Sequence, residues 1–376
     1  METVKTIDAF ALRYKEPHYR GLERWVTLVR LETTGGAVGW GEALTRYRGA
    51  ALATRVLALE AFAPIVQGQS PIDVEVLWRK MCASANWFGT EGLAALAISA
   101  FDMALWDLKG KLLGQPVSKL LGGQVHSEIP AMASIIFDMD DLDWTLNEFR
   151  GFREAGYRIV KAGWGMRVEA MFGQDRQRDL HYLREIRKVI GTDISLVVDI
   201  PGPFGVWDSA TAIRRIREWE EFDLRWVEQP LKSADLDGYA RLRAAVTTPI
   251  GTGEDEWGLE SYTHLIRSQG ADILQLDPAW ALGLTGCRQV VMAVEAAGLK
   301  YNAHTWSSAV NTAASLHMVA LSPAGDTLDF KPHDSPMQHD LVEDPWVPVN
   351  GMLALRDIPG LGITVREDAM KKYAVT

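Results

Sequence analysis

The stretch ISLVVDI, residues 194–200, is a short apolar run that ends in an acidic residue, and it decides the fold. A second run of the same kind, DLRWVEQP, occupies residues 223–230. The same pattern extends in both directions with helix-length segments between the runs, and from ISLVVDI onward the spacing is roughly 25–30 residues. The further runs are AMASII (131–136), RIVKAG (158–163), TPIGTGED (248–255), DILQLDP (272–278), LKYNAHT (299–305) and TLDF (327–330). Continuous apolar strands that alternate with helices indicate a parallel sheet covered on both faces, and eight such units close into a barrel.

The segments on either side of these runs have a different spacing of apolar residues. Residues 1–45 alternate like antiparallel strands, with a turn at Gly35-Gly36, and residues 50–122 have apolar residues at helical spacing. We therefore expect an α+β domain at 1–127, a barrel at 128–335, and a turn-rich segment at 336–376 that returns to the first domain.

Composition narrows the class of protein. The chain has 376 residues and a net charge of −10, and no block of Lys or Arg suggests nucleic-acid binding. Its two cysteines, Cys82 and Cys287, lie far apart, which fits a reducing compartment. The N-terminus lacks the apolar stretch of a signal peptide, and we find no apolar run that approaches the length of a membrane span. We expect a cytoplasmic protein without nucleic-acid or membrane partners, and a homo-oligomer.

Catalytic groups of such barrels lie at the carboxyl ends of the strands. Three successive strands end in carboxylates: Asp199, Glu228 and Glu254. Carboxylates at one barrel mouth repel each other and are costly to bury, and a divalent cation removes this cost. Three oxygen ligands on rigid strands leave positions open for water and substrate, which suits Mg²⁺. Each acid alone could instead be a helix N-cap or a solvated loop residue, and Glu256 would share the face of Glu254 if the register differs.

The next two strands end in Asp277 and His304. A buried aspartate that accepts one imidazole N–H orients the ring and raises its basicity, which leaves the other ring nitrogen for substrate. A lone histidine is more often a satisfied polar group, but this pairing favours a catalytic base. Lys161 ends the second strand, and Asp329 lies in the eighth.

With these residues in place, the chain resembles the enolase superfamily, in its mandelate racemase and muconate-lactonizing branch. The motifs are VGWGEA (38–43), AISAFDMALWDLKGKLLGQPVSKLLGG (97–123), VEQP (227–230) and GLGITV (360–365). The resemblance implies a modified (β/α)₇β TIM-type barrel under a capping domain formed by the N-terminal part and the C-terminal tail. It also implies one Mg²⁺ on Asp199, Glu228 and Glu254, a His304–Asp277 dyad, and removal of the proton alpha to a carboxylate.

The sequence departs from the racemases in three places. Racemases of this branch carry Lys-x-Lys on the second strand, whereas here the pattern is Lys161-Ala162-Gly163. Pro201 replaces a usual asparagine, and Asp329 stands where the racemases have glutamate. Racemisation needs a proton acceptor on each face of the intermediate, whereas dehydration needs only one residue that acts as base and then acid. Lys161 would then pair with the substrate carboxylate, or with a metal-ligand carboxylate.

Two groups of loop residues are candidates for substrate contact. Tryptophans follow several strand ends, and at least two of them are expected to line the pocket: Trp164, Trp207, Trp257, Trp280 and Trp306. Packing against the capping domain is the alternative for each. The loop at 13–24 would close over the site, with His18, Tyr19 and Arg20 as contacts.

The sequence therefore predicts a Mg²⁺-dependent lyase, a hydro-lyase that dehydrates a sugar acid through an enediolate. One alternative is a racemase or epimerase of a 2-substituted carboxylate whose second base is Lys161 or another group. The other is a homologue that binds metal or carboxylate without catalysis.

Overall fold

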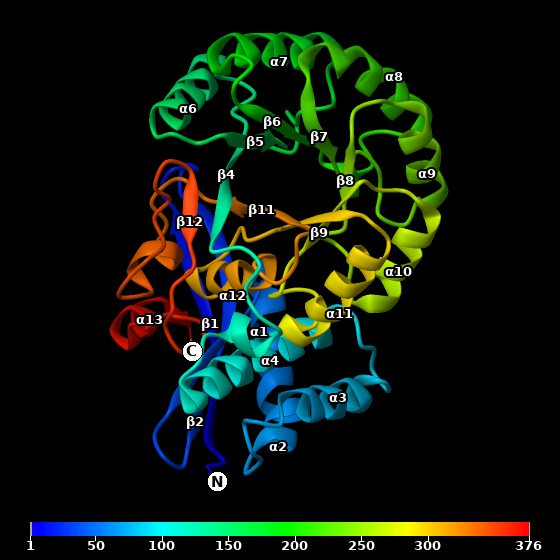
Figure 1. The fold of residues 1–376 in the computed structure, drawn as a ribbon. Helices are drawn as coiled ribbons and strands as arrows, with labels where there is room; N and C mark the ends of the chain where they lie inside the picture. Colours follow the sequence, from blue (N-terminus) through cyan, green and yellow to red (C-terminus); the bar gives the residue numbers. More distant parts are fainter. Residues whose placement is uncertain (1, 376) are drawn as a thin grey trace.

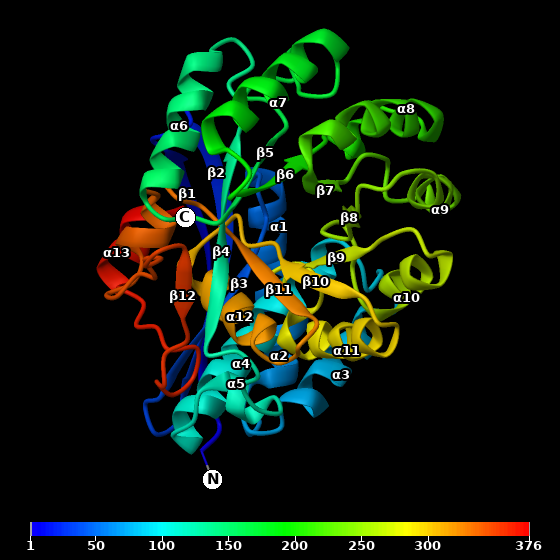
Figure 2. The same ribbon diagram turned by 45° about the horizontal axis from the view of Figure 1, so that its top comes forward.

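The apolar runs after residue 128 form the parallel strands of a closed barrel, which confirms the predicted α/β fold class. This computed structural model describes residues 2–375. The first and last barrel strands pair through Leu328 and Ala131, and this pairing closes the ring (Figure 2). The barrel strands are β4 (Glu128–Ile136), β5 (Ile159–Gly163), β6 (Ser195–Asp199), β7 (Leu224–Glu228), β8 (Ile250–Thr252), β9 (Ile273–Leu276), β10 (Lys300–Ala303) and β11 (Gly325–Phe330).

The helices between these strands cover the outside of the barrel (Figure 1). They are α6 (Leu142–Glu154), α7 (Arg176–Ile190), α8 (Ser209–Trp219), α9 (Leu236–Ala245), α10 (Leu259–Ser268), α11 (Gly283–Ala296) and α12 (Ala309–Val319), with short turns η2 (Gly202–Phe204), η3 (Glu220–Phe222) and η4 (Pro336–Asp340). One helix between each pair of successive strands gives the (β/α)₇β order that the sequence predicted.

The barrel interior has an apolar floor and a polar layer above it. The floor is a cluster of buried side chains from five strands: Met132, Ile159, Val197, Trp226 and Ile273. Successive side chains of a strand point to opposite faces, so the residue two positions on returns to the interior. That residue is polar in all five strands: Ser134, Lys161, Asp199, Glu228 and Gln275. Strand alternation therefore places the ionic residues together at the carboxyl ends of the strands.

The cap is an antiparallel sheet with helices packed on it. Its strands are β1 (Val4–Glu16), β2 (Leu22–Thr33), β3 (Val38–Ala43) and β13 (Ala374–Val375), and its helices are α1 (Arg48–Leu57), η1 (Ala58–Phe62), α2 (Ala63–Val66), α3 (Val74–Ala85), α4 (Leu93–Leu113) and α5 (Val117–Leu120). A Cβ at Gly41 of β3 would lie 1.9 Å from the carbonyl oxygen of Ala100 in α4. The glycines of VGWGEA therefore allow α4 to lie directly against the sheet.

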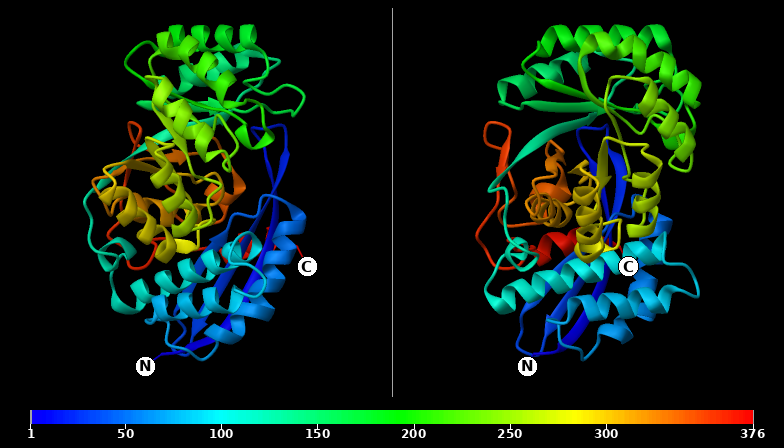
Figure 3. Two further views of the ribbon diagram at one scale, coloured as in Figure 1. Left: turned by 90° about the vertical axis from the view of Figure 1, so that its right-hand side faces the viewer. Right: turned by 45° about the vertical axis from the view of Figure 1, so that its right-hand side comes forward.

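The cap contacts the barrel at the loops that carry the predicted site. Glu42 at the end of β3 accepts the backbone N–H groups of Ser308 and Asn311, and Leu44 donates its N–H to Ala279. The β1–β2 hairpin reaches the part of the barrel that carries α6 (Figure 3). The cap therefore forms one wall of the barrel mouth.

The C-terminal segment divides between the two units. Strand β12 (Met352–Ala354) pairs with β4 of the barrel, whereas β13, after α13 (Glu367–Tyr373), pairs with β1 of the cap. Leu361 donates its N–H to Asp107 of α4 at 2.9 Å. The return of the tail to the cap is thus seen in β13 and Leu361, while the predicted boundary at residue 336 stays a prediction.

One apolar helical run needs a correction to the sequence analysis. By length and composition alone, Arg48–Val66 would be long and apolar enough to cross a membrane, whereas we expected no run of that length. It lies in the cap, where α1 packs against β1, β2 and α4. The run as a whole buries Ala51, Thr54, Ala58, Phe62 and Val66. The run continues from α1 through the π-helical turn η1 into α2.

We expect the free energy of unfolding to decrease as the pH is lowered below about 6.5, because of His317 of α12. This side chain is buried between barrel and cap, its Nδ1 accepts the Ser118 N–H at 3.2 Å, and burial lowers its pKa to about 4. The unfolded chain, with a pKa near 6.5, then binds the extra proton first as the pH drops. The stabilisation is complete above pH 6.5 and lost toward pH 4, about 2 kcal/mol of it between pH 7 and 5. Urea unfolding at both pH values measures it.

Two variants check this assignment. His317→Asn, whose amide oxygen can accept the same N–H, should lose about 2 kcal/mol less than the natural chain over this interval. His181→Asn, on the exposed side of α7, should behave like the natural chain. Equal pH dependence in the His317 variant would contradict the role given to His317.

Candidate active site at the barrel mouth

A cavity of about 390 Å³ lies between the barrel mouth and the cap. The carboxyl ends of β5, β6, β10 and β11 and the residues after β8 contribute its charged and polar groups. Of the residues predicted from sequence, its lining includes Lys161, Asp199, Glu254, His304, Asp329, Trp164, Trp306 and Tyr19. Glu228 is fully buried below the lining, and Asp277 lies behind His304.

The predicted dyad is formed. His304 Nδ1 lies 2.7 Å from Asp277 Oδ2, and because a carboxylate only accepts, we assign the proton to Nδ1. Asp277 Oδ1 accepts from Asn311 Nδ2 at 3.0 Å and from the Ala279 N–H at 2.8 Å, which fixes its orientation. His304 Nε2 is left facing the cavity, 3.5 Å from Glu254 Oε2. Burial by itself lowers the pKa of His304, but the Glu254 charge and the Asp277 hydrogen bond outweigh it and raise this pKa to about 9.

Lys161 is enclosed by carboxylates. Its Nζ lies 2.5 Å from Glu228 Oε1, 2.6 Å from Asp329 Oδ2 and 3.4 Å from Asp199 Oδ2. Burial would lower the pKa of Lys161, but Asp329 and the other carboxylates outweigh it and hold the pKa well above its usual value. The ion-pair alternative for Lys161 is therefore seen in the structure, and the ammonium also faces the cavity.

The residues predicted as metal ligands supply only oxygen atoms, the donors that Mg²⁺ prefers. Asp199 Oδ1 is buried and, among the described residues, has no hydrogen-bond partner. Glu228 Oε2 is held by Trp226 Nε1 at 2.9 Å. Burial raises the pKa of Asp199 well above its usual range and that of Glu228 to about 7. The site therefore holds carboxylates that a cation would stabilise, and its residues fit Mg²⁺.

The side chains do not converge tightly on a point in this structure. Among the described residues, the ligand atoms of Asp199, Glu228 and Glu254 are not all within 4.8 Å of one another. Each carboxylate has a protein cation beside it instead: Lys161 contacts Asp199 and Glu228, and Arg46 Nη2 lies 3.5 Å from Glu254 Oε1.

Sequence reasoning missed two arginines of the cap that line the cavity. Arg46 follows β3 with a φ of 56°, a left-handed conformation that turns it toward Glu254. Arg24 of β2 has its guanidinium 5.3 Å from the Trp306 ring, and its Nε is buried without a hydrogen-bond partner among the described residues. Neither lies at the end of a barrel strand, so the pattern that revealed the other residues does not include them. The location of Arg46 shortly after VGWGEA, beyond Leu44 and Thr45, was the available signal.

The tryptophans and loop residues divide into two sets. Trp164 and Trp306 line the cavity, and Tyr19 lies with its ring 5.3 Å from that of Trp306. Trp257 and Trp280 instead stack on each other at 4.1 Å, and Trp207 packs on Trp219. His18 pairs with Glu148 and Arg20 pairs with Asp138, so both are engaged outside the lining, and we do not include them in the proposed site.

The close backbone packing at Gly163 explains why the second lysine of the racemase pattern is absent here. A Cβ at this position would lie 1.8 Å from the carbonyl oxygen of Asp199 and 2.6 Å from its carbonyl carbon. The Trp164 N–H donates to the same oxygen at 3.1 Å, so neither strand can move aside without losing this bond. The close approach of β5 and β6 therefore leaves no room for any side chain at 163.

We expect Gly163→Ala to lower the free energy of unfolding by at least about 2 kcal/mol, because the contact is with backbone that cannot rotate away. Gly163→Lys should be destabilised as well and should gain no racemase activity. Gly151→Ala is the matched control, since its Cβ meets nothing within 4 Å in α6. Urea unfolding of the three variants measures the effect, and an unchanged Gly163→Ala protein would contradict this account.

Comparison with known families gives matches along nearly the whole chain. Residues 20–122 match the family described as "Mandelate racemase / muconate lactonizing enzyme, N-terminal domain". Residues 145–369 match the family described as "Enolase C-terminal domain-like". The first range falls in the cap and the second takes in most of the barrel.

Three relatives indicate the range of activities in this neighbourhood. D-galactarolactone cycloisomerase of Agrobacterium fabrum is 29% identical over 92% of this chain and 90% of its own. L-talarate/galactarate dehydratase of Salmonella typhimurium is 30% identical over 82% of this chain and 73% of its own. The structure of L-talarate dehydratase from Polaromonas sp. JS666, complexed with Mg and L-glucarate, is 26% identical, with a TM-score of 0.88 over 100% of this chain and 98% of the other.

Proposed function

We propose that this chain, which belongs to the enolase superfamily in its mandelate racemase and muconate lactonizing branch, is a Mg²⁺-dependent dehydratase of a sugar acid. Its relatives are sugar-acid dehydratases and a cycloisomerase, and the chain is an enzyme of the same superfamily. The observation that carries the proposal is the asymmetry of the cavity. The cavity holds one oriented base, the His304–Asp277 dyad. Its lysine, Lys161, is instead held by three carboxylates, and Gly163 two positions further on has no room for a side chain.

His304 is the residue that moves the proton. Its Nε2 faces the cavity while Asp277 holds Nδ1. Burial lowers the pKa of His304, the Glu254 charge is the largest cause that raises it, and a cation bound to Glu254 would offset that charge, which favours the neutral ring. The neutral ring accepts the proton alpha to the substrate carboxylate at Nε2. The same Nε2 then returns that proton to the departing β-hydroxyl. The substrate loses one water, the enol product rearranges to a 2-keto acid, and His304 regains its starting state.

Asp199, Glu228 and Glu254 are the residues that hold the metal. Members of this superfamily use Mg²⁺, and a dehydratase neighbour carries Mg together with L-glucarate. When bound, Mg²⁺ supplies positive charge that stabilises the substrate carboxylate more as its α-proton leaves than before.

Lys161 places a second positive charge at the same end of the cavity. Its hydrogen bonds to Glu228 and Asp329 fix the ammonium at the lining, where it can pair with the substrate carboxylate. Asp329 is itself held by Asn302 Nδ2 at 3.2 Å, and we assign it to positioning Lys161. A lysine that keeps its proton is a poor base, which argues against the racemase alternative based on Lys161.

Cycloisomerisation is the second candidate, favoured by the similarity to the Agrobacterium enzyme over most of the chain. It shares the initial proton removal and would use the same His304. Binding without catalysis is the least supported candidate, because an oriented dyad adds nothing to simple carboxylate binding.

A panel of aldonic, uronic and aldaric acids and their lactones, incubated with Mg²⁺ in D₂O, tests the proposal. Dehydration predicts a 2-keto acid with one water lost and no change of configuration in recovered substrate. A product of unchanged mass indicates cycloisomerisation, and deuterium at an inverted α-carbon indicates racemisation. The homo-oligomeric state, the cytoplasmic location and the absence of nucleic-acid or membrane partners stay predictions.

We also expect Arg24 to contribute to substrate binding. Because its buried Nε lacks a partner among the described residues, the guanidinium is available to an oxygen of the substrate. Arg24→Met should raise KM by about 10- to 100-fold with a smaller change in kcat, since a hydrogen bond to a charged group is worth about 1.5–3 kcal/mol. Arg13→Met, on the exposed part of the same hairpin, is the control. A fall in kcat alone would contradict a binding role.

A further inference from the structure

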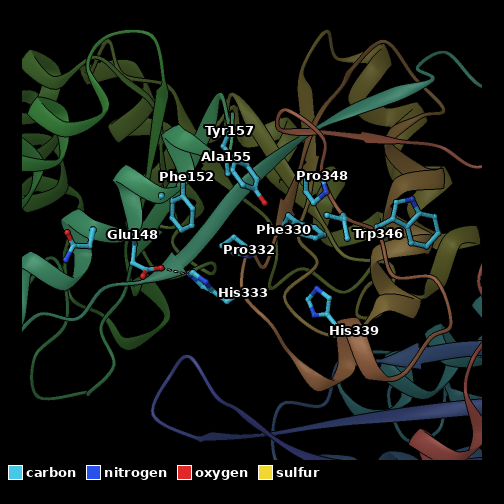
Figure 4. A pocket seen from close by; sticks show the side chains of 13 residues that line it. Glu148, Phe152, Ala155, Tyr157, Phe330, Pro332, His333, His339, Trp346 and Pro348 are labelled. Atoms are coloured by element: carbon cyan, nitrogen blue, oxygen red, sulfur yellow. Dashed lines mark ion pairs between the residues drawn. The ribbon is translucent and has the colours of Figure 1, made fainter.

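Three ligand-type side chains meet outside the active site, where the β1–β2 hairpin touches the barrel. His18 comes from the hairpin turn, Glu148 from α6, and His333 from the segment after β11. One ligand atom from each lies within 4.8 Å of the other two. Glu148 Oε2 is 2.6 Å from His333 Nε2 and 3.2 Å from His18 Nε2. Glu148 and His333 are drawn together in Figure 4.

Glu148 is the shared ion-pair partner of His18 and His333. The two imidazole Nε2 atoms and Glu148 Oε2 are buried, and among the described residues they are in ion-pair contact without a hydrogen bond of regular geometry. The two rings stack at 3.4 Å with 16° between their planes. The stacked rings therefore place both Nε2 atoms beside one carboxylate oxygen, so that two imidazole nitrogens and one carboxylate are gathered in a single cluster.

We propose that His18, Glu148 and His333 form a second metal site that takes a transition metal of the Zn²⁺ type. Two imidazole nitrogens and one carboxylate oxygen are a Zn²⁺ donor set that leaves one position open. Imidazole ligands select against Mg²⁺, which prefers oxygen donors, so this site and the catalytic site take different ions. Binding of one ion by both rings would require the two histidine side chains to rotate so that each Nε2 lone pair points toward it.

The cluster lies between a cavity on one side and a wall of the active-site cavity on the other. A cavity of about 370 Å³ is lined by both Glu148 and His333, and it opens the site to solvent. The ligands come from the cap and from two barrel segments, so a bound ion ties the hairpin to the barrel. Tyr19, the residue after His18, lines the active-site cavity and packs edge-on against His18. The metal therefore fixes a wall of the substrate pocket.

Counting bound metal tests the site. The full chain, saturated with Mg²⁺ so that the catalytic carboxylates are occupied, is dialysed against Zn²⁺ and analysed by mass spectrometry. We expect the natural chain to bind one more Zn²⁺ than His333→Leu. Zn²⁺ affinity should fall by more than about 100-fold, because even outer-shell changes cost about 10- to 100-fold. His339→Leu, in the same cavity lining but outside the cluster, should keep the ion.

A spectrum and a second variant exclude effects of misfolding. With Co²⁺ in place of Zn²⁺, the natural chain should show visible absorption bands of nitrogen ligation that His18→Gln lacks, and circular dichroism confirms that each variant is folded. Equal Zn²⁺ counts and identical Co²⁺ spectra in natural and variant chains overturn the proposal. In that case, lower thermal stability of the variants would identify the cluster as an ion pair only.

Discussion

Replacing His304 with asparagine should reduce kcat by about 10,000-fold and change KM little. General acid–base groups contribute about 100- to 10,000-fold, and this residue both removes the proton and returns it. The loss corresponds to about 5 kcal/mol of transition-state stabilisation. Exchange of the substrate α-proton with D₂O should disappear together with product formation, because both need the same Nε2.

The measurement is steady-state kinetics with the acid identified in the panel, together with NMR of the α-position. His264→Asn, an exposed histidine on α10, controls for the substitution itself and should leave both rates unchanged. If His304→Asn keeps more than a tenth of the natural kcat, the proton is removed by another group and the one-base mechanism is wrong.

Changing Glu254 to glutamine should reduce activity by about 1,000-fold and weaken Mg²⁺ binding, since charge stabilisation by a metal is worth several kcal/mol. Glu256→Gln is the matched control, with the same substitution two residues further along. Glu254 lines the cavity beside His304, whereas Glu256 is outside the lining. The pair therefore decides the register that the sequence left open after β8.

Calorimetric titration with Mg²⁺ and measurement of kcat at saturating Mg²⁺ distinguish the two variants. Treatment of the natural chain with a chelator should remove activity, and added Mg²⁺ should restore it. A larger loss in Glu256→Gln than in Glu254→Gln would transfer the ligand role to Glu256 and contradict the site described here.

The sequence was most informative where a strand end fixes a side chain. Asp199, Lys161 and His304 could be placed at one mouth because parallel strands bring their carboxyl ends together, and the structure lines one cavity with all three. The same rule predicted Asp277 behind His304. Strand alternation, a local property, was sufficient for these residues.

The strand-end pattern could not predict which residues of the cap line the cavity. Arg24 and Arg46 reach the cavity because of how the cap sheet lies on the barrel, which is a tertiary contact without a periodic signature. His18 and Arg20 were expected there from their place in the hairpin, but each found an acidic partner on the barrel instead. Gly163 was recognised as a departure from the racemase pattern. Only the structure showed the cause, because a Cβ at this position would lie 1.8 Å from the Asp199 carbonyl oxygen.

The polar layer above the apolar floor has a consequence for protein engineering. Hydrocarbon side chains at those five positions would extend the core, whereas the natural side chains bring charges together at an energetic cost. Selection for thermal stability alone would therefore replace these five polar residues in its first rounds. The resulting barrel would be more stable and would have no catalytic activity. A library built on this scaffold needs a screen for turnover from its first round.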